Sequence, residues 1–375
     1  MSNFKSLVPA YLHTLPSYKP GKPVRQAELE SGVSCIKMAS NENPFGPSPL
    51  AIEAIQRAAG DIHFYPDNDL IELRTALAEI NGLEMNQVMI TSGSTSFLDV
   101  LARTLLGPGL NAVTSKHSFI VYPVVTRAAG AQLIEAPTRD YGYDLDAIAD
   151  AVSADTRAVF LANPNNPTGT LVDAHAIDQF LDRLPANVIT VLDEAYYDYA
   201  GYFAAQRGVE YSHALQHVRE GRPVVVLRTF SKAHGLAGLR VGYGFGPAEL
   251  IGYFNRLKPP FMVSSVGEAA ALAALADTEH VAASVRSNAV ESERLRKAIS
   301  AFGIQVVPTW ANFLYCEIGE ECESVCRQLQ DTGIIVRHLV GSWNAPHAFR
   351  LTVGTPEQNS KFIDALKRVL ARVPA

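Results

Sequence analysis

Between about residues 87 and 246, short apolar runs alternate with segments in which apolar residues recur every three or four positions. The apolar runs are rich in β-branched residues, which predicts buried strands, and the intervening segments carry the helical period. The predicted strands are 87–92, 111–115, 131–137, 156–163, 187–195 and 223–232. The predicted helices between them are 94–107, 120–130, 144–154 and 173–184. Because strands that alternate with helices form βαβ units, we expect a mostly parallel sheet with helices on both faces.

Beyond about residue 262 the pattern changes. The stretch 266–303 predicts one long helix or two helices in sequence. The further predicted strands are 304–309, 312–318, 334–339 and 349–354, with helices near 321–332 and 356–372. This order is typical of a second, smaller α+β unit. The first forty residues lack a clear period and are interrupted by Pro and Gly, so we expect them to wrap onto the rest of the protein.

Composition and charge narrow the class of protein. Of 375 residues, 47 % are hydrophobic and 19 % are charged, which is a globular composition long enough for two or three domains. A net charge of −6 argues against nucleic acid or an anionic membrane as the main partner. No apolar run has membrane-spanning length, and the first residues match neither a signal peptide nor an anchor.

The four cysteines are few for a chain of this length, which favours a reducing compartment and a cytoplasmic protein. Cys322 and Cys326 stand four apart on a predicted helix and resemble half of a metal site. No second CxxC or HxxxH completes four ligands, so we expect ordinary packing and no metal.

Polar residues follow the predicted strands, at the sheet edge where open α/β sheets bind ligands. Gly93, Ser94 and Thr95 come after the first strand and open a helix, which suits a phosphate, although taken alone Ser94 or Thr95 is more often a plain N-cap. Asn166 lies in the stiff turn "NPNNPTG", which is either only a loop or the holder of a ligand hydrogen bond. Asp193 ends a buried strand, where a carboxylate needs a cation from a salt bridge or from a ligand.

The last of these strands leads into Thr229, Ser231 and Lys232, followed by Arg240. A lysine at the end of a buried strand is costly unless it forms an imine, and an arginine fork suits a phosphate. A phosphate cup, an amide, a carboxylate and a lysine together match pyridoxal 5′-phosphate, whose aldehyde, ring nitrogen, phenolic oxygen and phosphate need that set.

Longer motifs accompany these residues: "SNENPFGPSP", "YPD", "SFIVYP", "NPNNPTG", "DEAY", "TFSKAHGLAGLRVGY" and "FRLTVGT". With these motifs the sequence resembles the fold-type-I, class-II pyridoxal-phosphate-dependent aminotransferases over nearly its whole length, and most closely the histidinol-phosphate aminotransferase family. The resemblance implies a large domain with a mostly parallel sheet covered by helices, plus a smaller α+β domain. The implied division is an N-terminal segment, 1–45, that packs on the small domain and the partner, a large cofactor-binding domain, 46–265, and a small C-terminal domain, 266–375.

The resemblance also assigns roles to the matching positions. Lys232 matches the lysine that holds the cofactor as a Schiff base and moves a proton, and Asp193 matches the partner of the ring nitrogen. Tyr196 and Asn166 would hold the phenolic oxygen, and Phe119 would stack on the ring. The cofactor phosphate would be held by Gly93, Ser94, Thr95, Thr229, Ser231 and Arg240, with Tyr65 reaching in from a partner subunit. The acidic end of the substrate would be held by Arg350, with Arg337, Tyr18 and Asn41 close by.

Two positions depart from the usual pattern of the family. "STSF" follows "TSG" where many members carry an acidic residue, which leaves the backbone donors intact and bears on the side-chain role of Thr95. Phe119 stands where many members have tyrosine, so stacking is kept and a hydroxyl is lost.

The implied reaction is transamination from L-histidinol phosphate to 2-oxoglutarate, giving imidazole acetol phosphate and L-glutamate in histidine biosynthesis. It would proceed by ping-pong transfer in a homodimer with shared active sites. The nearest alternative is an aromatic amino acid aminotransferase, and a further one is a pyridoxal-phosphate-dependent decarboxylase of a phosphorylated amino acid. A regulator that binds the cofactor without turnover is disfavoured because no helix-turn-helix or basic segment precedes the fold.

Overall fold

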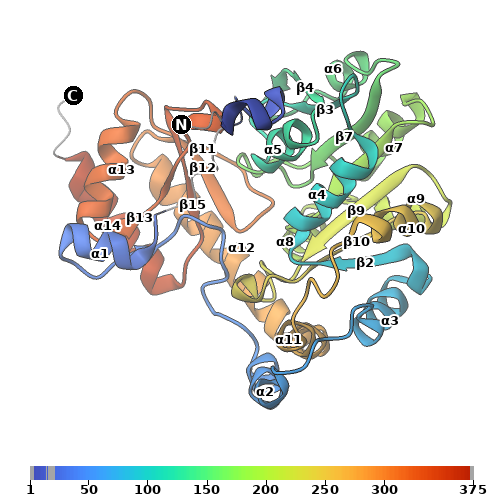
Figure 1. The fold of residues 1–375 in the computed structure, drawn as a ribbon. Helices are drawn as coiled ribbons and strands as arrows, with labels where there is room; N and C mark the ends of the chain where they lie inside the picture. Colours follow the sequence, from blue (N-terminus) through green and yellow to red (C-terminus); the bar gives the residue numbers. More distant parts are fainter. Residues whose placement is uncertain (1–3, 14, 16–21, 372–375) are drawn as a thin grey trace.

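The six predicted strands of the first pattern all form, and they lie in one seven-stranded sheet of the computed structural model, which describes residues 4–13, 15 and 22–371 (Figure 1). Across the sheet the order is β2 (Val88–Thr91), β10 (Gly242–Phe245), β9 (Val224–Thr229), β8 (Ile189–Asp193), β7 (Thr156–Ala162), β3 (Asn111–Ser115) and β4 (Gln132–Ala136). Neighbouring strands are parallel except where β10 runs antiparallel to β2 and β9. The sheet is therefore mostly parallel, as predicted.

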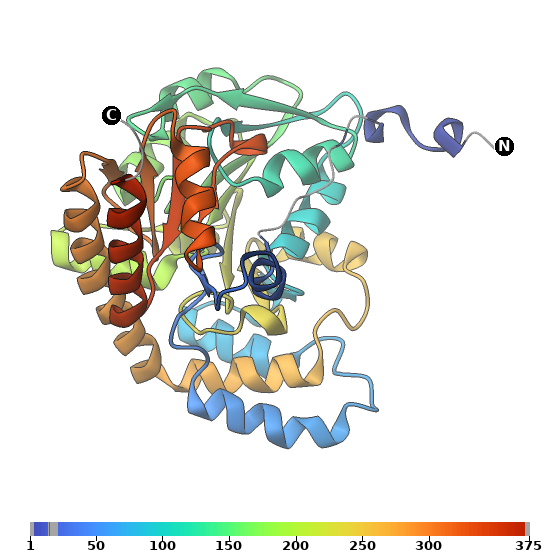
Figure 2. The same cartoon turned by 90° about the vertical axis from the view of Figure 1, so that its left-hand side faces the viewer.

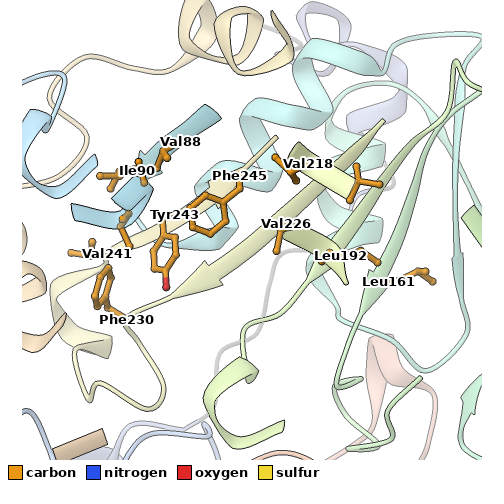
Figure 3. Close-up of a cluster of buried hydrophobic side chains, with 14 of the residues drawn as sticks. Val88, Ile90, Leu161, Leu192, Val218, Val226, Phe230, Val241, Tyr243 and Phe245 are labelled. Carbon is orange, nitrogen blue, oxygen red and sulfur yellow. The ribbon is translucent and has the colours of Figure 1, made fainter. Parts of the chain in front are cut away.

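Successive residues of a strand point to opposite faces of the sheet, and in this sheet both faces are buried. On β9, Val226 belongs to the core of one face, while Val225 and Leu227 belong to the core of the other. The first face is covered by α3 (Ile71–Asn81), α6 (Leu145–Asp150), α7 (Ala174–Arg183), α9 (Ala214–Arg219) and α11 (Ser265–Ala276). The second is covered by α4 (Ser94–Leu105), α5 (Val121–Ala128) and α10 (Ala248–Leu257). Figure 3 shows the first core, with Tyr243 and Phe245 of β10 beside Val226 of β9.

The smaller unit is built from the C-terminal pattern and appears in orange and red in Figure 1. Its antiparallel sheet has the order β11 (Gln305–Val307), β12 (Phe313–Glu317), β15 (Ala348–Thr352) and β14 (Arg337–His338). Its helices are α12 (Thr278–Ser300), α13 (Cys322–Asp331) and α14 (Pro356–Leu370). The α14 helix begins where its sequence predicts, because Thr355 and Gln358 form a capping box around Pro356. Cys322 is buried in the core of this unit and Cys326 packs against it, which is the ordinary packing predicted.

The stretch 266–303 forms two helices, and the first of them packs on the large unit. The α11 helix lies along α2 (Pro49–Ala58), as the blue and light-orange helices show in Figure 2. Its small residues Ala270, Ala271 and Ala274 join the core of the large sheet. We therefore propose that the small domain begins near Asp277, at the turn into α12, rather than at 266.

The N-terminal segment contacts both units. Helix α1 (Val24–Ser31) packs on α13, and β1 (Ile36–Lys37) pairs in parallel with β13 (Ile334–Ile335) of the small unit. Residues 10–12 pack instead on α5. The remaining elements are α8 (Tyr197–Arg207), the hairpin β5 (Thr138–Arg139) and β6 (Gly142–Tyr143), and the 3-10 turns η1 (Phe4–Leu7), η2 (Ala10–Leu12), η3 (Ala59–Asp61), η4 (Met85–Gln87), η5 (Ala237–Leu239) and η6 (Gly341–Trp343).

Within the described ranges, none of the helices combines the length and the apolar composition needed to cross a bilayer.

Candidate active site

A cavity of about 190 Å³ lies where β7, β8 and β9 end, against the small unit. The chain after β1 forms part of its wall through residues 39–41. The predicted site residues that line it are Asn41, Ser94, Thr95, Phe119, Asn166, Asp193, Tyr196, Thr229, Ser231, Lys232, Arg240, Arg337 and Arg350. The structure thus brings together side chains from both units and from the N-terminal segment.

One end of the cavity is a cup of hydroxyl groups with an arginine over it. Ser94 and Thr95 form the first turn of α4, and Thr229 Oγ1 donates to Ser231 Oγ at 3.0 Å. Arg240 Nη1 lies 3.5 Å from Ser231 Oγ. A helix N-terminus, hydroxyls and a guanidinium in one place attract an anion.

Glycines are what allow the parts of this cup to approach. A Cβ at Gly93 would lie 2.7 Å from Arg240 Nη2, and Gly93 has a positive φ of 78°. A Cβ at Gly242 would lie 2.3 Å from the backbone nitrogen of Ser94. Gly93 itself does not line the cavity. Unlike the other predicted phosphate-binding residues, it has no side chain, so only its backbone could contribute to the cup.

Lys232 presents its amine to the cavity. Its Nζ donates to the carbonyl oxygen of Ser40 at 3.2 Å and lies 5.7 Å from the centre of the Tyr196 ring. Burial, with the charge of Arg350 as a second cause, lowers the pKa of Lys232 from 10.5 to about 7. An amine with this pKa is substantially neutral near pH 7, as a nucleophile or base must be.

Asp193 is buried on the floor of the cavity. Its Oδ2 accepts a hydrogen bond from the Tyr122 hydroxyl at 3.1 Å, and its Oδ1 accepts one from the backbone of Ala195 at 3.3 Å. Burial raises the pKa of Asp193 to about 6, and the Tyr122 hydrogen bond opposes this shift. Such a carboxylate is well placed to meet a cationic group of a ligand.

A set of amides and an arginine surrounds the Tyr196 hydroxyl. The side-chain amides of Asn41 and Asn166 donate to this oxygen at 2.8 and 3.3 Å. Arg350 in turn donates to Asn166 Oδ1, and to the backbone oxygen of Ala39 at 2.9 Å. These links join the N-terminal segment, both units and the cavity in one network.

Phe119 lines the cavity on the side of α5, with its ring at 85° to that of Tyr122 and the ring centres 5.5 Å apart. Tyr122 itself stacks on Phe160 at 4.9 Å. Phe119 thus packs on Tyr122, which Phe160 supports in turn.

Among the predicted site residues that the structure describes, Tyr65 and Gly93 do not line this cavity. Tyr65 is 83 % exposed and stacks on Phe261, with 4.7 Å between ring centres. Tyr18 lies outside the described residues.

Sequence reasoning missed two residues of the site. Tyr122 donates a hydrogen bond to Asp193, and its signal was its place in the motif "SFIVYP", three residues after Phe119. Trp343 lines the cavity from a loop of the small unit, where no polar residue or period pointed to it. In the part of the chain that the structure describes, no three side chains of His, Cys, Asp or Glu are grouped so that they could hold a metal ion.

Comparisons with known proteins match these features. Residues 33–366 match the family model described as aminotransferase class I and II. The chain is 42 % identical over 374 residues to a Pseudomonas fluorescens protein named histidinol-phosphate aminotransferase 2, with 99 % of each chain covered. It is 43 % identical over 357 residues to a histidinol-phosphate aminotransferase of Moorella thermoacetica, covering 94 % of this chain and 90 % of that one. The crystal structure of histidinol-phosphate aminotransferase from Sinorhizobium meliloti in complex with pyridoxal-5′-phosphate has a TM-score of 0.88 and 28 % identity, over 98 % of both chains.

Proposed function

The chain belongs to the aminotransferase class I and II family, and we propose that it transfers the amino group of L-histidinol phosphate to 2-oxoglutarate. The products are imidazole acetol phosphate and L-glutamate, and the reaction is a step of histidine biosynthesis. Full-length relatives that carry this name support the assignment. The structural observation that carries it is one amine, Lys232, set between the hydroxyl cup and the pair Arg337 and Arg350. Such a cavity has one place for a cofactor phosphate and another for an anionic substrate.

The family and the neighbour solved with pyridoxal phosphate imply dependence on that cofactor, and the residues present fit it. A Cβ at Gly242 would collide with the backbone of Gly93 and Ser94, so glycine there lets α4 begin close to β10, with its N-terminal N–H groups and the Arg240 guanidinium near one place for a phosphate. We infer that the phosphate is held by Ser94, Thr95, Thr229, Ser231 and Arg240.

When bound, the cofactor supplies an electron sink for the negative charge left on the substrate Cα after loss of its proton. The chain's part is to keep that sink effective. Asp193 provides a buried carboxylate that would hold the ring nitrogen protonated, and the hydrogen bond from Tyr122 favours the ionised form of this carboxylate. Tyr196 and Asn166 would hold the phenolic oxygen, and Phe119, which lines the same cavity, would cover one face of the ring.

Lys232 has two tasks in this scheme. It would bind the cofactor covalently between turnovers, and its freed amine would then take the proton from the substrate Cα and deliver it to the cofactor carbon C4′. Forming the covalent link and taking the proton both need the neutral amine, which the lowered pKa of about 7 makes available. Burial is therefore the feature that fits this lysine to its role.

The acidic end of each substrate would meet Arg350 and Arg337. Both side chains line the cavity on the side of the small unit. The two substrates of a ping-pong reaction use the same place in turn, so these arginines would serve the phosphate of histidinol phosphate and a carboxylate of glutamate.

We further propose a cytoplasmic homodimer in which Tyr65 of one chain completes the phosphate site of the other. Its exposure supports this, because an aromatic residue that lies outside its own cavity is available to a partner.

The experiment is a panel of amino donors with 2-oxoglutarate, comparing kcat/KM for histidinol phosphate, phenylalanine and tyrosine. We expect histidinol phosphate to be preferred, with glutamate formed in equal amount, and Lys232→Ala to remove the reaction. Preference for the aromatic amino acids would replace the proposal by the aromatic aminotransferase. Release of CO₂ without glutamate would identify a decarboxylase, and absence of turnover with every donor would leave only a binding protein.

A further inference from the structure

Trp343 ends the turn η6 and is buried at the cavity wall. Its indole Nε1 donates a hydrogen bond to the backbone oxygen of Ser118 at 3.1 Å. Ser118 immediately precedes Phe119, which lines the same cavity from the large unit. One indole thus connects the small-unit loop to the turn that carries Phe119.

The same indole faces both substrate-side arginines. The guanidinium carbons of Arg337 and Arg350 lie 5.2 and 5.7 Å from the centre of its ring. At these distances a tryptophan face attracts a guanidinium group. Because the indole is buried and tied to Ser118, it is a fixed surface against which the two guanidinium groups lie.

The strand register places the two arginines side by side. Arg337 of β14 is the direct cross-strand partner of Arg350 of β15. Like charges directly opposite each other on neighbouring strands destabilise a sheet unless something offsets the repulsion. Here the aromatic ring offsets part of the repulsion, and an anion bound between the two guanidinium groups would lower it further.

Arg350 has further contacts that do not depend on Trp343. Its guanidinium also lies 5.3 Å from the centre of the Phe313 ring and donates to Ala39 and Asn166. Loss of the indole would therefore leave Arg350 oriented while it removes the aromatic surface that Arg337 and Arg350 share. The indole thus contacts both guanidinium groups and fixes where one lies relative to the other.

We propose that Trp343 is a positioning residue that holds Arg337 and Arg350 as one site for a dianionic phosphate monoester and so favours histidinol phosphate over carboxylate ligands. One bidentate arginine satisfies a carboxylate, whereas a phosphate monoester has three free oxygens and nearly two charges. This inference rests on the proposed function, because it names the residue that selects the phosphate-bearing donor. It assigns no chemical step to Trp343.

A binding experiment can use the indole itself as the reporter. The chain has two tryptophans, and the other one, Trp310, lies under Arg207, 4.3 Å from its guanidinium carbon and away from the cavity. Trp310→Phe therefore leaves Trp343 as the sole indole, and Trp343→Phe is the matched control that leaves only Trp310. Both are loaded with pyridoxal phosphate, so that the cofactor phosphate site is filled, and titrated with inorganic phosphate or acetate at constant ionic strength.

We expect a saturable change of indole emission in Trp310→Phe, with phosphate acting at about tenfold lower concentration than acetate. Trp343→Phe should show no such change. Equal midpoints for the two anions, or no saturable change with phosphate, would overturn the proposal.

A kinetic experiment separates positioning from a general structural role. Trp343→Leu should raise KM for histidinol phosphate about tenfold with kcat nearly unchanged, and raise KM for glutamate much less. Trp343→Phe keeps an aromatic face and should recover most of the loss. An equal rise of both KM values, a loss confined to kcat, or no recovery in Trp343→Phe would contradict the role. If Trp343→Leu fails to fold, Trp343→Phe and the emission titration still decide.

The two proposals fail separately. Wild-type protein that does not turn over histidinol phosphate would refute the proposed function, whatever the emission titration gives. Wild-type protein that prefers histidinol phosphate but shows no discrimination between phosphate and acetate at Trp343 would refute only this inference.

Discussion

Two ionisable residues of the cavity have pKa values that burial has moved towards each other. The pKa of Asp193 is raised to about 6 and that of Lys232 is lowered to about 7. Both shifts oppose the charged forms, so the fold bears a cost at this site for the sake of function. A ligand with a cationic ring nitrogen would stabilise the ionised form of Asp193, and covalent attachment of Lys232 would remove its buried charge.

Asp193→Asn tests the carboxylate directly. The amide keeps the shape of the side chain but cannot hold a ring nitrogen protonated, so the fold should survive while kcat falls by on the order of 10²-fold or more. Steady-state kinetics, with circular dichroism as the check on folding, make the comparison. Near-normal kcat would show that another group holds that nitrogen.

Tyr122→Phe tests the residue behind the carboxylate. It removes a hydrogen bond that favours ionised Asp193, so the pKa of Asp193 should rise further and the acid limb of the kcat profile should move to higher pH, by about one unit. The measurement is kcat against pH. Tyr199→Phe is the control, because Tyr199 is also buried and the structure shows no hydrogen bond from its hydroxyl to Asp193. An unchanged acid limb in Tyr122→Phe would contradict the role.

At the residue scale, the sequence was most informative where an apolar strand is followed directly by a polar residue. Asp193, Thr229 and Lys232 stand out because each follows an apolar run, and all three line the cavity. Tyr122 and Trp343 belong to no such boundary, since aromatic residues in a helix and a loop are as easily core residues. Their part in the site depends on contacts across the fold, which neither local pattern nor spacing encodes.

At the element scale, β10 is the strand of the large sheet that the pattern did not predict. Its sequence, Gly242–Phe245, has two glycines, which are unfavourable inside a strand. The structure gives the reason for them. A Cβ at Gly242 would meet Ser94 and Gly93, and one at Gly244 would lie 2.5 Å from the Phe97 ring. Close packing of this strand under α4 therefore determines its composition, and tertiary contact overrides strand propensity.

Gly242→Ala should disturb the cup through this contact. The added methyl group forces β10 and the start of α4 apart, which should cost about 1–3 kcal/mol of stability and weaken pyridoxal phosphate binding. Gly252→Ala is the matched control, because Gly252 is exposed on α10 and a Cβ there meets nothing within 4 Å. That variant should be neutral or slightly more stable. Denaturant unfolding and cofactor titration measure the two effects, and equal behaviour of the variants would contradict the packing argument.

A charged network joins α7 to α9 and predicts a pH dependence. His213 contacts Glu210 at 2.6 Å and Asp178 at 2.7 Å, and His217 shares Asp178 at 2.7 Å. Glu210, followed by Asp178, raises the pKa of His213 above 6.5. A raised histidine pKa contributes stability that is fully present below the unfolded value and is lost as pH rises through the folded one.

His213→Gln should therefore lower the melting temperature most below pH 6.5, and the difference from wild type should shrink as the pH rises above that value. His347→Gln, at an exposed histidine 3.8 Å from Glu320, is the control and should show little dependence. A constant difference for His213→Gln at every pH would mean that packing, rather than charge, explains its effect.

At the scale of the whole molecule, the sequence predicted two units and a mostly parallel sheet, and both are present. The sequence pattern did not show that α11 packs on the large sheet, because an alanine-rich helix has no strong polar face to indicate which unit it covers. The N-terminal segment illustrates the same limit. Asn41 reaches Tyr196 because β1 pairs with β13 and the Asn41 backbone N–H donates to Thr352 Oγ1, both about three hundred residues later in the chain.

At the scale of the whole molecule, a single chain does not explain why the apolar surface around Tyr65 is exposed. Ile62, Phe64 and Tyr65 are 68 %, 66 % and 83 % exposed, and Phe261 beside them is 43 % exposed. Exposed apolar side chains gathered in one place are typical of a protein interface. A phenol there can bury its ring against a partner and donate its hydroxyl to a phosphate.

The last prediction is that Tyr65 acts across a dimer interface, and mixing two inactive chains tests it. One chain carries Lys232→Ala with Tyr65 intact, and the other carries Tyr65→Ala with Lys232 intact. Each homodimer should be poor, but the mixed dimer has one complete site, made from the lysine of the second chain and the tyrosine of the first. Its activity, corrected for the fraction of mixed species, should approach half that of the wild-type dimer. If Tyr65 served its own chain, the mixed dimer would have no complete site and mixing would recover nothing. Full activity of the Tyr65→Ala homodimer would contradict any place for this residue at the phosphate.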